Sequence, residues 1–88
     1  MDKTQPVSIT LEFPITTAAG QVKTITMRRA KVKDLRRMAD FGKTDAEQEI
    51  GLMARLAGMT AEDFDELDAV DYRKLQETFR GLLGVGAA

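Results

Sequence analysis

The sequence of 88 residues contains no cysteine and no histidine, and it has only two prolines and one tyrosine. Without cysteine the chain can form neither a disulfide nor a thiolate metal site. Without histidine it lacks the commonest general base and the commonest metal ligand of proteins. No apolar run approaches the length of about 18 residues that a membrane-spanning helix needs. We therefore expect a protein that is not an enzyme, has no catalytic, cofactor-binding or metal-binding residues, and does not span a membrane.

The composition is that of a single small soluble domain, with 43% hydrophobic and 31% charged residues. Residues 1–6 are polar and end in proline, so we expect a disordered tail, then one domain at residues 7–84, and a frayed C-terminus at residues 85–88. The first residues also lack the basic-then-apolar pattern of a signal peptide, which predicts a cytoplasmic protein. A core of this size barely exceeds the entropy of ordering the chain, so a homo-oligomer or a partner could contribute to stability.

The first third of the domain has the period-two pattern of β-strands. Apolar and polar residues alternate from Val7 to Phe13, which predicts a strand with one buried face that Pro14 ends or places at a sheet edge. A turn of small residues at 16–20 precedes a second strand at 21–29, which is rich in threonine and β-branched residues. The two strands most simply form an antiparallel hairpin, which must pack on other elements because a lone hairpin is marginally stable in water.

From residue 32 onward the apolar spacing changes to that of helices. The second helix begins at the capping box Thr44–Glu47 and ends at Gly58, and a short helix is expected at residues 60–67. The apolar face of the first helix is Val32, Leu35, Met38 and Ala39. That of the second helix is Ile50, Met53, Ala54 and Ala57. That of the last helix is Tyr72, Leu75, Phe79 and Leu82. Strands followed by helices indicate an α+β fold with an N-terminal antiparallel β-hairpin followed by three to four packed α-helices.

The apolar end of the last helix has two interpretations. Leu82, Leu83 and Val85 could belong to the core or could form an exposed docking patch. The sequence does not distinguish these alternatives.

Acidic residues gather between residues 60 and 71, and helix capping accounts for several of them. Thr60 with Asp63, and Asp68 with Asp71, each resemble a capping box in which Asp replaces the usual Glu or Gln. A calcium-binding loop would need an oxygen ligand and a glycine where Leu67 and Asp68 stand. We therefore interpret the acidic residues as structural and expect no metal site.

The net charge of −1 is divided unevenly along the chain. Residues 1–43 carry nine basic and four acidic side chains, whereas residues 44–88 carry four basic and ten acidic ones. Such a division can indicate a nucleic-acid face, a partner face or head-to-tail self-association. It can equally reflect attraction between the two halves of one fold.

A basic cluster follows the second predicted strand: Arg28, Arg29, Lys31, Lys33, Arg36 and Arg37. Such a cluster could contact nucleic-acid phosphates or an acidic partner, or it could be a plain solvated surface. Nucleic-acid binding is disfavoured by the isoelectric point of about 5.4 and by the lack of an aromatic residue within the cluster for base stacking.

Several segments occur together in an order that is typical of one protein family. They are an apolar strand ending Phe13-Pro14-Ile15, the basic segment 25–35, and the blocks 49–60 and 63–72. Across residues 7–83 the chain resembles the small tail assembly chaperones of contractile-tailed bacteriophages, the family of the Mu-like and P2-like tail chaperone proteins. The last two blocks are the most specific, and the chain departs from the family at Ala30, where proline is frequent.

The resemblance implies a chaperone of the host cytoplasm without enzymatic activity or cofactors. Its partners would be the phage tape measure protein, bound before tail tube subunits polymerise around it, and the tail tube protein. The family supplies no binding residues that carry over to this chain. From the basic cluster we hypothesise that the partner-binding residues are Arg28, Arg29, Lys31, Arg36 and Arg37. The alternative is a small nucleic-acid-associated or regulatory protein that uses the basic cluster at residues 28–37.

Overall fold

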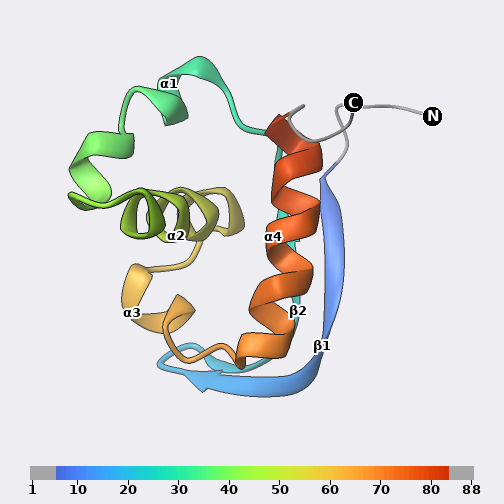
Figure 1. Ribbon diagram of the computed structural model, residues 1–88. Coiled ribbons are helices and arrows are strands. Elements are labelled where there is room, and N and C mark those ends of the chain that lie inside the picture. Colours follow the sequence, from blue (N-terminus) through green and yellow to red (C-terminus); the bar gives the residue numbers. More distant parts are fainter. Residues whose placement is uncertain (1–5, 84–88) are drawn as a thin grey trace.

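In the computed structural model, which describes residues 6–83, a two-stranded antiparallel sheet precedes all of the helices (Figure 1). The elements are strands β1 (Val7–Thr17) and β2 (Gly20–Met27), helix α1 (Val32–Leu35), the 3-10 helix η1 (Met38–Phe41), and helices α2 (Asp45–Ala57), α3 (Ala61–Phe64) and α4 (Ala69–Leu83). The predicted α+β fold with an N-terminal hairpin and three to four helices is confirmed. Of the tail predicted at residues 1–6, residues 1–5 lie outside the described residues, and so does the fraying predicted at residues 85–88.

The core lies where α2 and α4 meet the hairpin. Helix α4 runs alongside the hairpin and packs against β1, while α2 packs against β2 (Figure 1). The buried apolar side chains are Leu11, Ile15, Ile25, Met27, Leu52, Met53, Ala54, Leu56, Phe64, Leu75, Phe79 and Leu82. Each large side chain among them contributes roughly 1.5–3 kcal/mol by leaving water. The apolar face predicted for the last helix is confirmed, and Leu82 belongs to the core.

The helix ends follow the predicted capping signals in part. Thr44 and Glu47 form the reciprocal capping box, and Gly58 ends α2 in the left-handed conformation at φ 69°, which glycine adopts without steric cost. The Thr60 hydroxyl accepts a hydrogen bond from the Asp63 amide, and the helix that follows makes only one turn. The side chain of Asp68 accepts a hydrogen bond from the Val70 amide and so caps α4.

The helix predicted from the apolar face at Val32 is wrong in extent and in orientation. The chain forms the single turn α1 and then η1, and Val32 and Leu35 are 71% and 44% exposed. Asp34 is completely buried instead. Because residues two apart lie on nearly opposite sides of a helix, an inward Asp34 directs Val32 outward.

Strand β1 does not keep one regular buried face either. Thr10 pairs with Thr24 and Ile15 pairs with Val22, so four residues of β1 lie opposite a single residue of β2. The strand bends in this region (Figure 1). It continues past Pro14 to Thr17, and Phe13 is 51% exposed. The predictions that Phe13 is buried and that Pro14 ends the strand are therefore wrong, and residues 11–14 form an irregular segment instead. The alternative prediction that Pro14 lies at a sheet edge is confirmed, because β1 is an edge strand of a two-stranded sheet.

A buried carboxylate of α4 holds this irregular segment. Asp71 accepts hydrogen bonds from the backbone amides of Glu12 and Phe13 at 2.9 and 3.0 Å. These amides lie between the last regular pairs of the sheet, so Asp71 supplies acceptors where the strand ladder is interrupted. One turn later, Lys74 pairs with the Glu12 carboxylate. Asp71 therefore connects α4 to β1 and does not complete the capping box predicted for it.

Gly51 allows η1 to approach α2 closely. A Cβ atom at this position would lie 2.3 Å from the Cβ of Phe41. We expect Gly51→Ala to lower the free energy of unfolding by about 1–2 kcal/mol, because overpacking outweighs the better helix propensity of alanine. Denaturant unfolding of the purified chain measures the change.

Gly81 provides the matched control because a Cβ there would meet no atom within 4 Å. Gly81→Ala in α4 is expected to leave stability unchanged or raise it by up to about 1 kcal/mol. Equal effects of the two substitutions would contradict the close contact between Gly51 and Phe41.

Candidate functional site

The basic cluster begins with an arginine that has a structural role. The two terminal nitrogens of the Arg28 guanidinium donate to the two carboxylate oxygens of Asp34 at 2.7 and 2.8 Å. Arg55 of α2 donates to the same carboxylate at 2.7 Å, and the Lys31 amide donates at 2.8 Å. The Arg28 amide also donates to the carbonyl of Leu56. These contacts attach the segment after β2 to the C-terminal half of α2.

This ion cluster changes the acidity of Asp34. The hydrogen bonds from Arg28 are the largest cause that holds the pKa of the Asp34 carboxyl well below its usual range. Burial of the carboxylate opposes them, while Arg55 and the Lys31 amide add to the depression. Asp34 therefore remains ionised in the folded protein, and its single negative charge neutralises one of the two positive charges of Arg28 and Arg55.

The structure divides the basic residues into two groups. Arg28, Arg29 and Lys31 line one hollow of about 260 Å³. Lys33, Arg36 and Arg37 line another of about 440 Å³, together with Asp40. Lys33, Arg36 and Arg37 are all exposed. Lys33, Arg36 and Arg37 therefore form a basic surface on α1 and the turn after it, and Arg28 lies apart from it in the ion cluster.

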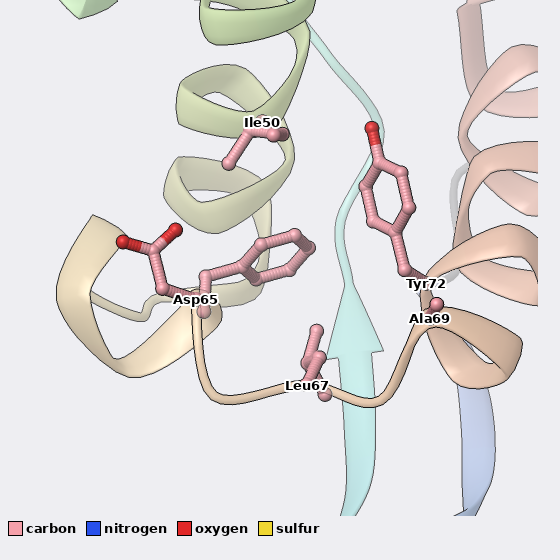
Figure 2. Close-up of a pocket in the computed structure, with 6 residues that line it drawn as sticks. Ile50, Asp65, Leu67, Ala69 and Tyr72 are labelled. Atoms are coloured by element: carbon pink, nitrogen blue, oxygen red, sulfur yellow. The ribbon is translucent and has the colours of Figure 1, made fainter.

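A second surface, which we call the α2–α4 groove, extends from the start of α4 past α2 and α3 to η1. It consists of two adjoining hollows, of about 230 and 190 Å³, that share Ile50 and Asp65. Figure 2 shows Ile50 reaching from α2, Tyr72 from the start of α4, and Leu67 from the connection before it. The other lining residues are Phe64 and Ala69 in the first hollow and Phe41, Glu47, Gly51 and Ala61 in the second.

The aromatic wall of the groove is fixed by specific contacts. The rings of Phe64 and Tyr72 meet edge to face, with centroids 6.3 Å apart. The Tyr72 hydroxyl donates to Glu49 at 3.3 Å, and Gln76 donates to the same carboxylate at 2.7 Å. Burial is the largest cause that raises the pKa of Tyr72, and the Glu49 charge adds to it. Tyr72 is therefore a neutral, partly apolar wall at physiological pH.

The chemistry of these surfaces suits binding. Among residues 6–83 no three carboxylate side chains gather in a way that could hold a metal ion. In the same part of the chain, no helix has the length and apolar character needed to cross a bilayer. A basic surface and an apolar groove with acidic side chains are features of protein interfaces.

The sequence matches the family model of phage tail assembly chaperone proteins, described as E, or 41 or 14, over residues 8–84. The chain belongs to this family. Searches of curated proteins and of solved structures found no match. The family resemblance drawn from the order of the sequence segments is thus confirmed, and with it the general role in phage tail assembly.

For this tail assembly chaperone, sequence reasoning found one candidate surface and missed the other. The basic cluster is visible as a run of charges, although the pairing of Arg28 with Asp34 is not. The α2–α4 groove was missed because its lining comes from segments that are far apart in the chain. One local signal was available: Leu67 and Tyr72 flank the cap Asp68 at the spacing of a hydrophobic staple, and both line the groove.

Proposed function

We propose that this protein binds the tape measure protein of its phage in the host cytoplasm and assists assembly of the tail tube, without a catalytic step. The family match over nearly the whole chain carries this proposal. Tape measure proteins are long and helical, and a charged amphipathic helix could contact both an apolar groove and a basic surface. The tail tube protein is the second proposed partner.

Affinity capture tests the proposal directly. The tagged full-length chain is expressed in cells while the parent phage or prophage is induced, and captured proteins are identified by mass spectrometry. We expect recovery of a long helical tail protein together with tail tube protein. Recovery of nucleic acid without tail components would contradict the proposal and favour the alternative regulatory or nucleic-acid-associated function of residues 28–37.

Charge reversal tests the hypothesis that the basic surface contributes. In an Arg36→Glu, Arg37→Glu double variant we expect about tenfold weaker binding of the tape measure protein at low salt, because charges at an interface rim steer association. The difference should shrink near 1 M salt, where the Debye length is about 3 Å. Titration by fluorescence anisotropy at two salt concentrations measures both effects.

The control for this variant is Lys23→Glu with Arg73→Glu, which makes the same change in net charge on exposed residues of β2 and α4. The affinity of this control for the tape measure protein should stay within about twofold of that of the unmodified protein. Unchanged low-salt binding of the double variant would remove Arg36 and Arg37 from the interface. Arg28 is not used because its loss would disturb the Asp34 ion cluster.

A further inference from the structure

Each of the two hollows of the α2–α4 groove is smaller than a usual small-molecule site and has the size to receive a protruding side chain. Their volumes of about 230 and 190 Å³ lie below the range of about 300–1,000 Å³ that is usual for small-molecule sites. Ile50, Leu67 and Tyr72 are only partly buried although they pack against the core. An apolar side chain placed between them would bury this remaining surface.

The charge of the groove restricts the occupant. The charged side chains that line it are Asp65 and Glu47, which are both acidic. Glu47 is already used in the capping box of α2. Within residues 6–83 the side chain of Asp65 makes no hydrogen bond or ion pair, and the residue is exposed at the end of α3. Asp65 is thus available to a cation of a partner at the edge of an apolar site.

We propose that the α2–α4 groove binds helical segments of the tape measure protein in which apolar side chains three or four residues apart are flanked by Lys or Arg. This inference rests on the proposed function and identifies the surface and the class of client segment. Two adjoining hollows match two apolar anchors on one helix face, because side chains at that spacing are neighbours. The acidic side chains select basic flanks by charge complementarity.

The first test compares neighbouring charge reversals in the full-length chain. Overlapping fluorescent peptides that cover the tape measure protein of the same phage are titrated with the unmodified protein, and the tightest peptide is kept. Asp65→Lys is expected to weaken its binding at least tenfold. Glu66→Lys makes the same charge change on the next residue, which is exposed and does not line the groove, and should stay within twofold.

A charge exchange separates pairing from indirect effects. Replacing the flanking Lys or Arg of the peptide with Glu should weaken binding to the unmodified protein and restore binding to Asp65→Lys. Leu67→Ala should weaken binding about fivefold with little dependence on salt, because it removes an apolar wall. Its control is Val70→Ala, which truncates an exposed side chain outside the groove lining.

The outcomes separate this inference from the proposed function. If no tape measure peptide and no intact tape measure protein binds the unmodified chain, the proposed function fails. If the unmodified chain binds but Asp65→Lys and Leu67→Ala bind equally well, the groove proposal alone is overturned. It is also overturned if sedimentation shows that these variants lose self-association while their binding of the peptide is unchanged. The groove would then bind a second copy of the chain, in which the exposed Val32 and Leu35 are flanked by basic residues.

Discussion

Replacing Asp34 with asparagine is expected to lower the free energy of unfolding at pH 7 by about 2–4 kcal/mol. The carboxylate is completely buried and accepts hydrogen bonds from Arg28, Arg55 and the Lys31 amide. Asparagine removes the negative charge and directs an NH2 group toward one of these donors. The loss stays below that of a fully buried pair because the arginine side chains are 40% and 37% exposed and regain water. Urea unfolding measures the change.

The control is Asp40→Asn, which removes an exposed carboxylate 3.8 Å from Arg37 and should cost less than about 1 kcal/mol. The pH dependence of the free energy of unfolding provides a second test of Asp34. Because folding lowers the pKa of Asp34, its stabilisation is complete above the unfolded pKa of about 3.9 and is lost as the pH falls below that value. The Asp34→Asn variant should lose less stability than the unmodified protein over this acidic range. If the free energies of unfolding of the two proteins fell in parallel as the pH is lowered, the role assigned to Asp34 would be contradicted.

Replacing Asp71 with asparagine is expected to cost about 2–4 kcal/mol, because one of the two strand amides would face an NH2 group instead of an acceptor. Asp71 is completely buried and serves both the Glu12 and the Phe13 amide. The irregular part of β1 should loosen before the rest of the domain unfolds. Denaturant unfolding measures the stability, and amide hydrogen exchange at Glu12 and Phe13 should become faster than at Ile9 and Ile25.

Asp68→Asn is the matched control, with the same chemical change three residues earlier. Asp68 caps α4 by accepting from the Val70 amide, and asparagine is an equally good N-cap, so the expected change is within about 0.5 kcal/mol. Equal effects at Asp68 and Asp71 would show that Asp71 acts only at the helix start and would refute its contact with β1.

Local patterns in the sequence were sufficient for the order and type of the main elements. Alternation predicted β1, and threonine-rich β-branched residues predicted β2, because strand side chains alternate between two faces. The capping box Thr44–Glu47 and the stop at Gly58 located both ends of α2, because these signals act within one turn of backbone. The prediction that Leu75 and Phe79 form the buried face of the last helix was likewise correct, since α4 packs against β1.

The candidate surfaces were only partly predictable. The basic cluster was evident as six cations within ten residues, but a count of charges does not reveal that Arg28 is paired with a buried acid. The helix predicted from Val32 was wrong because the spacing of apolar residues was taken to mark the buried face, whereas Val32 and Leu35 are exposed. The buried ion cluster outweighed this pattern and directed Asp34 toward α2.

By itself, the sequence determined the α+β class, the hairpin, the helix limits at strong caps and membership of the tail assembly chaperone family. Each of these depends on neighbouring residues or on a conspicuous order of segments. Only the tertiary structure decided the partners of Asp34 and Asp71, the irregular course of β1 and the α2–α4 groove. The contact of Asp34 with Arg55 joins residues 21 positions apart, and that of Asp71 with Glu12 joins residues 59 positions apart. Such contacts arise from packing in three dimensions, which local periodicity does not encode.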